Sequence, residues 1–192
     1  MPLKIHLSSR QLTLTAFFTV LTIMGGWIKI PMIPVPFTLQ TLFVVLSGLI
    51  GGPLIGSLSQ ILYLLIGLIG LPVFSQGGGP MYVLQPTFGY LLAFPLAAFV
   101  TGVYSRHFSE SAPFHKLLLS VTSGFLIIMF FGVTLLYLNL NFISEKPVSL
   151  QSAIFSGFII FLPGDIIKIF ILTWITKTLR KHQLINEYSN HK

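Results

Sequence analysis

Two oppositely charged side chains, Asp165 and Lys168, lie three residues apart in an otherwise apolar stretch of the chain. In an α-helix this spacing places both on one face, where they can pair. Asp165 precedes Lys177 by 12 residues, so it lies roughly 18 Å from that end of the helix at about 1.5 Å per residue. Ionisable groups at this depth in a membrane cost about 2.5–3.5 kcal/mol each and usually mark a functional site. The pair therefore predicts a ligand-binding site.

Pro163 and Gly164 come directly before Asp165. They predict a break in the helix that frees backbone N–H groups, and such groups favour a carboxylate. A broken helix is tolerated inside a membrane where it lines a cavity. The alternative interpretation is a structural ion pair that only neutralises itself or fixes this kink.

The composition indicates a membrane protein. Only 8% of the 192 residues are charged, 54% are apolar, and no charged residue occurs between positions 30 and 105. A soluble domain carries about 25% charged residues. The net charge of +7 comes from lysines and arginines at the chain ends and in one loop, not from a basic face, so nucleic-acid binding is not expected. The chain has no cysteine, hence no disulfide framework.

Apolar stretches separated by proline and glycine predict an all-α integral membrane protein with six transmembrane helices in one bundle. A span needs about 20 apolar residues, and the turn signals include Gly51-Gly52-Pro53 and Gly77-Gly78-Gly79-Pro80. We expect a single membrane domain over 1–192. The predicted spans are 12–28, 37–50, 54–71, 83–104, 116–138 and 150–179.

The loop charges predict the orientation of this bundle. With six spans, eight of the 11 Lys and Arg residues fall on the side that holds both termini, two fall on the other side, and Lys168 lies inside. Lysine and arginine favour the cytoplasmic side, so both termini are predicted to be cytoplasmic in the cell membrane. The loops at 29–36, 72–82 and 139–149 then face outward.

Other polar or flexible residues are placed to line the same outward cavity: Gln40, Gln85, Thr87, Tyr90, Gly78 and Gly79. The glycines allow the backbone to approach a ligand closely. Each also has a plainer interpretation. Gln40 and Thr87 suit hydrogen bonds between helices, Tyr90 suits an interfacial aromatic, and the glycines suit a simple loop.

Several functions are disfavoured. No Gly-Lys-Ser/Thr motif is present, so no P-loop ATPase is expected. All five histidines lie in predicted loops or tails, which argues against an intramembrane hydrolase or metalloprotease. No catalytic residue, metal or cofactor is predicted. The chain is expected to bind a solute rather than to act as an enzyme.

Four segments resemble the BioY family, the biotin-specific substrate-binding subunits (S components) of energy-coupling-factor transporters. The order and spacing of these segments carry the resemblance, which covers about residues 12–180. They are Pro36-Phe37-Thr38-Leu39-Gln40-Thr41-Leu42; 62–74 with Gly77-Gly78-Gly79; Pro86-Thr87, Gly89-Tyr90 and Phe94-Pro95-Leu96-Ala97-Ala98; and Pro163-Gly164-Asp165-Ile166-Ile167-Lys168.

The resemblance implies six helices and capture of biotin from outside. It also implies uptake with a partner module, which comprises a transmembrane coupling protein and two cytoplasmic ATPases. It assigns Asp165 and Lys168 to the ligand-binding pair and places Gln40, Thr87 and Tyr90 in the pocket. Which end of biotin Lys168 would contact stays open. The alternatives are an S component for another vitamin or heterocycle, a membrane-embedded enzyme, and a purely structural bundle.

Overall fold

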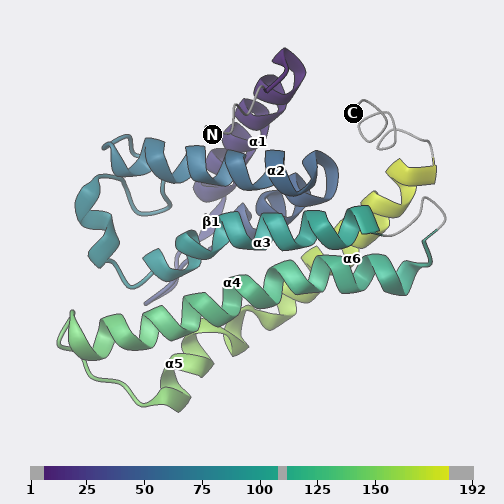
Figure 1. The fold of residues 1–192 in the computed structure, drawn as a ribbon. Coiled ribbons are helices and arrows are strands. Elements are labelled where there is room, and N and C mark those ends of the chain that lie inside the picture. Colours follow the sequence, from purple (N-terminus) through teal and green to yellow (C-terminus); the bar gives the residue numbers. More distant parts are fainter. Residues whose placement is uncertain (1–6, 108–111, 182–192) are drawn as a thin grey trace, which may run out of the picture.

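A computed structural model describes residues 7–107 and 112–181, which form helices and two short strands. Two of the eight basic residues counted above on the side of the termini, Lys4 and Lys192, lie outside the described residues. The helices α3 and α4 run side by side along the molecule, and α5 lies at one end of α4 (Figure 1). The elements in order are α1 (Ser9–Trp27), β1 (Lys29–Ile30), β2 (Phe37–Thr38), α2 (Gln40–Leu68), η1 (Pro80–Leu84), α3 (Phe88–His107), α4 (Phe114–Phe142), α5 (Leu150–Gly157), η2 (Ile159–Phe161) and α6 (Leu162–Lys181).

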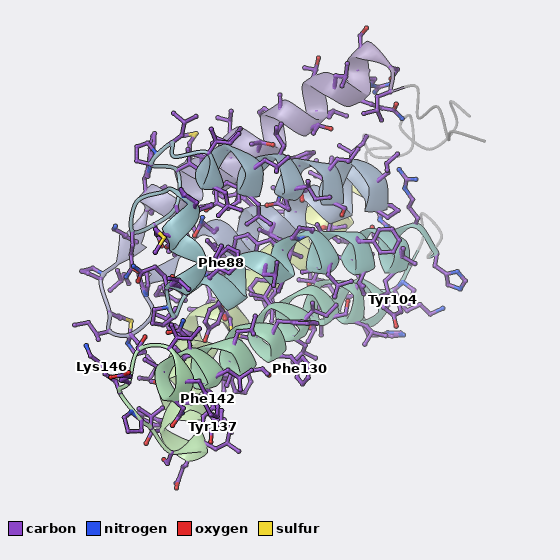
Figure 2. The ribbon with its side chains drawn as sticks, turned by 60° about the vertical axis from the view of Figure 1, so that its left-hand side comes forward. Phe88, Tyr104, Phe130, Tyr137, Phe142 and Lys146 are labelled. Carbon is purple, nitrogen blue, oxygen red and sulfur yellow. The ribbon has the colours of Figure 1, made fainter. Side chains whose placement is uncertain are left out.

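Four described segments are long and apolar enough to cross a membrane: Gln40–Leu68, Phe88–His107, Phe114–Phe142 and Leu150–Arg180. The surface supports this assignment because large apolar side chains point outward. Phe130 and Phe142 on α4 and Trp174 on α6 are 68%, 75% and 66% exposed, and Phe130 lies on the outer side of α4 in Figure 2. A surface this apolar suits lipid rather than water. The chain is therefore a multi-pass membrane protein.

Helix α2 is folded back on itself at Gly52. This residue has φ 74° and ψ −177°, a conformation that glycine adopts readily. Gln40 donates from Nε2 to the hydroxyl of Tyr63 at 2.5 Å, although 23 residues of unbroken helix would separate them by roughly 35 Å. Gln60 likewise donates to Ser47. The two arms of α2 therefore run antiparallel, as the turn signal at Gly51-Gly52-Pro53 predicts.

Two arginines fasten this turn to the ends of α3 and α6. The guanidinium of Arg106 lies over Gly52 and donates to the carbonyl of Gly51 at 3.3 Å. Arg180 donates to the hydroxyl of Ser105 at 2.7 Å, and that hydroxyl donates to the carbonyl of Leu49. These bonds satisfy carbonyls that the end of a helix leaves without partners.

The last apolar stretch, predicted as one span over 150–179, consists of α5, the short 3₁₀ helix η2 and α6. The predicted break is present, but it lies over Phe158–Phe161, before the proline. Pro163 and Gly164 belong to the first turn of α6. Proline fits a first turn because the N–H group it lacks would have no helical partner there. Asp165 thus lies in the first turn of a helix, where the helix dipole favours a negative charge.

Candidate functional site

Asp165 and Lys168 form a buried salt bridge. Their side chains belong to α6, with Lys168 Nζ 2.9 Å from Asp165 Oδ1, and the residues are only 5% and 4% exposed. The separation of three residues brings them together on one face of the helix, as the sequence predicts. The pair is thus removed from both water and lipid.

Lys168 has all of its donors engaged by the protein. Besides Asp165, its ammonium donates to the carbonyl of Thr38 at 2.8 Å and to the hydroxyl of Thr41 at 2.9 Å. An ammonium has three N–H donors, so these acceptors satisfy all of them. The ring of Phe37 lies beneath, with its centroid 3.9 Å from Nζ, and adds a cation–π contact. Lys168 is therefore fixed as a clamp between α6, strand β2 and the start of α2.

Asp165 keeps one oxygen for another partner. Its Oδ1 accepts from Lys168, and no donor among the described residues reaches its Oδ2. Asp165 also lines a cavity whose empty space is about 460 Å³ including its open mouth. A carboxylate oxygen that faces a cavity is a strong acceptor for an N–H or O–H group.

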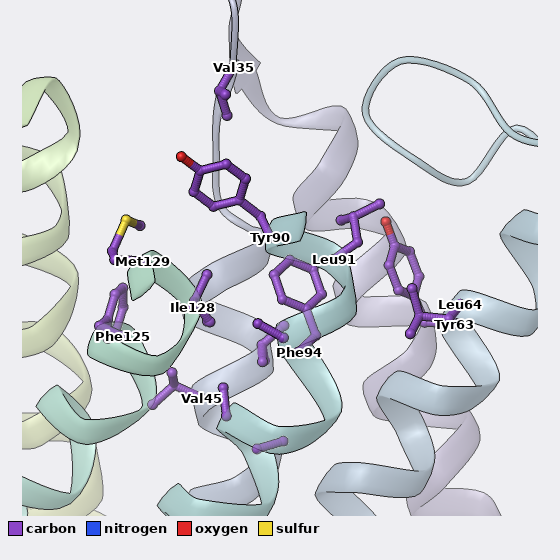
Figure 3. Packing of buried hydrophobic residues seen from close by; sticks show 14 of the residues in the cluster. Val35, Val45, Tyr63, Leu64, Tyr90, Leu91, Phe94, Phe125, Ile128 and Met129 are labelled. Carbon is purple, nitrogen blue, oxygen red and sulfur yellow. The ribbon is translucent and has the colours of Figure 1, made fainter. Parts of the chain in front are cut away.

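The wall of this cavity is mostly apolar, and its residues come from β2, the start of α2, α3, α4, η2, α6 and the adjoining loops. In Figure 3, Val35 of the β1–β2 connection lies above the ring of Tyr90, and Met129 of α4 lies to one side of that ring. The lining residues are Val35, Pro36, Phe37, Thr38, Gln40, Thr41, Ser75, Thr87, Tyr90, Leu91, Phe94, Met129, Phe161, Asp165 and Lys168. Apolar walls with a few placed polar groups are typical of small-molecule sites.

The sequence-predicted residues Gln40, Thr87 and Tyr90 meet at this cavity with Asp165 and Lys168. Each polar group already has a protein partner. Gln40 donates to Tyr63, Thr87 donates to the hydroxyl of Tyr82 at 3.2 Å, and Tyr90 donates to the carbonyl of Gly157 at 2.7 Å. These residues therefore shape the cavity, and Tyr90 also ties α3 to α5.

The structure does not bring Gln85, Gly78 or Gly79 to the cavity wall. Gln85 is exposed and lines a separate surface hollow beside Asn139. The N–H of Gly79 donates to the carbonyl of Gly67 at 2.7 Å. A Cβ on Gly78 would lie 2.1 Å from the carbonyl oxygen of Leu71. The two glycines thus let their loop pack closely against the end of α2, and their contact with a ligand stays a prediction.

The sequence reasoning missed several residues of the site. The rings of Phe37 and Phe161 stack with centroids 6.0 Å apart, and Phe37 lies against Gly164, whose lack of a Cβ leaves the room. Phe37, Thr38 and Thr41 all belong to the stretch 36–42 that carries the family resemblance. Thr41 could have been found there as a hydroxyl one position from Gln40. The carbonyl of Thr38 has no side-chain signature.

Two loops cover one side of the cavity. Strands β1 and β2 form an antiparallel hairpin in which Lys29 pairs with Thr38 and Ile30 with Phe37. The glycine loop that follows α2 contributes Ser75. Lys29 of the hairpin donates to the carbonyl of Ser75 and so joins the two loops. Within 7–107 and 112–181, no group of three His, Cys, Asp or Glu side chains could hold a metal ion.

A bundle of apolar helices around a buried charged pair and a small cavity defines a helical membrane protein with a small-molecule site. The sequence profile of the BioY family matches residues 1–184, so the chain belongs to the BioY family. A relative from Lysinibacillus sphaericus, named "Probable biotin transporter BioY", is 42% identical over 158 residues, 82% of this chain and 80% of its own length.

A second relative, the "Biotin transporter BioY" of Thermotoga maritima, is 39% identical over 173 residues, 90% of this chain and 96% of its own. Among solved structures, the S-component for biotin from an ECF-type ABC transporter superposes with a TM-score of 0.77 and 31% identity. The match covers 92% of this chain and 95% of that one.

Proposed function

We propose that this protein binds biotin as the substrate-binding subunit of an energy-coupling-factor transporter. The observation that carries the proposal is the open carboxylate oxygen of Asp165 in an apolar cavity of a BioY-family chain. The named relatives are biotin transporters, and the similar structure is an S-component for biotin. The proposed role is binding and transport, not catalysis.

The chemistry of biotin fits these groups. Its ureido ring carries two N–H donors and a carbonyl, its fused rings are apolar, and its side chain ends in a carboxylate. Asp165 Oδ2 accepts a ureido N–H, a charge-assisted hydrogen bond worth about 1.5–3 kcal/mol. Phe37, Leu91 and Phe94 hold the rings. Because Lys168 is already engaged, its role is to position Asp165 and the carbonyl of Thr38.

We propose six membrane crossings: α1, each arm of α2, α3, α4, and α5 with α6. Both termini are on the cytoplasmic side, since eight of 11 Lys and Arg residues fall there. The hairpin and the glycine loop then face outward, so biotin enters from outside. A transmembrane coupling protein and two cytoplasmic ATPases drive uptake, because an ECF-type ABC transporter uses ATP and this chain has no P-loop.

The test is a ligand panel on the purified protein in detergent. Biotin, desthiobiotin, thiamine and riboflavin are titrated by calorimetry, and each bound ligand is recovered and analysed by mass spectrometry. We expect tight, stoichiometric binding of biotin and its recovery unchanged. Preference for thiamine or riboflavin would reassign the substrate. A chemically altered ligand would indicate an enzyme. No binding of any ligand would favour the interpretation of the protein as a purely structural bundle.

A further inference from the structure

Lys29 places a second ammonium at the rim of the cavity. Its Nζ donates to the backbone carbonyl of Ser75, and Ser75 is a buried residue of the cavity wall. Lys29 itself is exposed. One end of this side chain thus contacts the wall of the site, while the residue remains open to water.

The β-hairpin sets Lys29 opposite the clamp around Lys168. Lys29 pairs with Thr38 across the two strands, which lie about 4.8 Å apart in such a ladder. Thr38 gives its carbonyl to Lys168. Two lysines therefore flank one strand residue. Lys168 is buried with all its donors engaged, whereas Lys29 is exposed and has one acceptor, the Ser75 carbonyl, among the described residues.

Lys29 is the sole charged side chain of the two loops that cover the cavity, since no Asp, Glu, Lys or Arg occurs from position 30 to position 105. An ammonium has three donors, so two remain after the bond to Ser75. If an anionic group of a ligand lies between these loops, Lys29 is the cationic side chain of the loops that can bind it.

We propose that Lys29 recognises the carboxylate of the ligand and makes the site selective for an acid over its neutral analogue. This inference rests on the proposed biotin function and assigns an orientation to it. The ureido ring meets Asp165 on α6, and the carboxylate emerges between the hairpin and the glycine loop. A ligand held in this way connects α6 to both loops, and the attraction by Lys29 also speeds the approach of an anion at low salt.

The competing role of Lys29 is purely mechanical, as a strap between the two loops. The variant Lys29→Gln separates the two roles, because glutamine keeps an N–H donor that can bond the Ser75 carbonyl but carries no charge. Lys29→Arg keeps the charge. Lys146→Met removes the charge of an exposed lysine on the α4–α5 loop and is the matched control.

The experiment measures the dissociation constants of biotin and of biotinamide, in which a neutral carboxamide replaces the carboxylate, for each purified protein. We expect Lys29→Gln to weaken biotin at least fivefold and biotinamide less than twofold. Lys29→Arg should restore the preference for biotin, and Lys146→Met should not change it. The association rate of biotin should lose most of its salt dependence in Lys29→Gln.

Equal losses for both ligands, or no loss for either, would overturn this role of Lys29 and leave it at most a strap. These results concern Lys29 alone, since biotin would still bind the wild-type protein. Failure of the wild-type protein to bind either ligand would instead reject the proposed function, and the role of Lys29 with it. If Lys29→Gln does not fold, the wild-type ratio of the two dissociation constants decides, because a ratio near one excludes recognition of the carboxylate.

Discussion

The ammonium of Lys168 donates to the carbonyl of Thr38 at 2.8 Å, although 130 positions separate them in the sequence. This bond joins α6 to β2, the second strand of the hairpin that covers one side of the cavity. The carboxylate proposed to bind the ligand is held by the same ammonium. The acceptor of the site and one of its covering loops are thus fixed to each other through a single nitrogen atom.

We expect Asp165→Asn to weaken biotin binding at least tenfold, or about 1.4 kcal/mol. An asparagine can still accept from Lys168 through its carbonyl oxygen, but it carries an NH₂ donor in place of Oδ2. The NH₂ group of the asparagine and the ureido N–H of biotin are both donors, so no hydrogen bond would form between them. Calorimetry on the purified variant measures the change. Glu145→Gln, which neutralises an exposed carboxylate on the α4–α5 loop, is the control, and an affinity within twofold of wild type in Asp165→Asn would remove Asp165 from the site.

Lys168→Met should destabilise the protein strongly, because it leaves the buried carboxylate of Asp165 without its partner. Breaking a buried pair in this way costs about 3–5 kcal/mol. The double variant Asp165→Asn, Lys168→Met should recover part of the loss, since neither charge remains. Thermal unfolding in detergent compares wild type, the single variants Asp165→Asn and Lys168→Met, and the double variant. Strictly additive losses would show that the two side chains do not stabilise each other.

The same variants separate the ligand site from a purely structural pair. We expect the double variant to fold and still to bind biotin at least tenfold more weakly than wild type. Wild-type affinity in the folded double variant would show that the pair serves only the fold.

Tyr90→Phe should loosen α5 more than it affects ligand binding. The variant removes the hydroxyl that donates to the carbonyl of Gly157 at 2.7 Å, and an unsatisfied buried acceptor costs about 1–3 kcal/mol. The ring that lines the cavity stays. We expect a lower unfolding temperature and faster amide exchange in α5, with biotin affinity within threefold. Tyr104→Phe on the outer face of α3 (Figure 2) is the matched control. An unchanged unfolding temperature in Tyr90→Phe would show that this bond does not hold α5.

Gly164→Ala should destabilise α6, although glycine to alanine within a helix by itself stabilises by roughly 0.5–1 kcal/mol. The new Cβ would lie 2.3 Å from Cζ of Phe37, so the ring must leave its place beneath Lys168. We expect weaker biotin binding as well as a lower unfolding temperature. Adding Phe37→Leu should recover stability by removing the clash. A more stable Gly164→Ala protein would mean that Phe37 shifts without cost.

Sequence reasoning reaches the charged pair because spacing along a helix is a local property. Asp165 and Lys168 need only three residues of helix to meet. The turn of α2 at Gly52 is similarly local, since glycine and proline restrict the backbone where they stand. Gln40, Thr87 and Tyr90 could be assigned to the cavity through the family resemblance, and the structure places all three on its wall.

The remaining features of the site depend on contacts between distant segments. Lys168 donates to the backbone carbonyl of Thr38. Because every residue carries a carbonyl, no sequence pattern identifies this acceptor. Pro163 and Gly164 were expected to form the break. In the structure Gly164 instead makes room for Phe37, a ring from the other end of the chain. The role of Ser75 likewise appears only once Lys29 is seen to reach its carbonyl.

The complete set of protein acceptors around Lys168 matters for repeated turnover. Its ammonium has Thr38, Thr41 and Asp165 as partners, and all three are supplied by the protein itself. A carrier that loads and unloads many times would otherwise expose a bare cation to hydrocarbon at each release, at a cost of several kcal/mol. Here release of the substrate breaks only the hydrogen bonds made by the substrate and leaves those of Lys168 in place. Tight binding and later release of the substrate are therefore compatible in one small membrane protein.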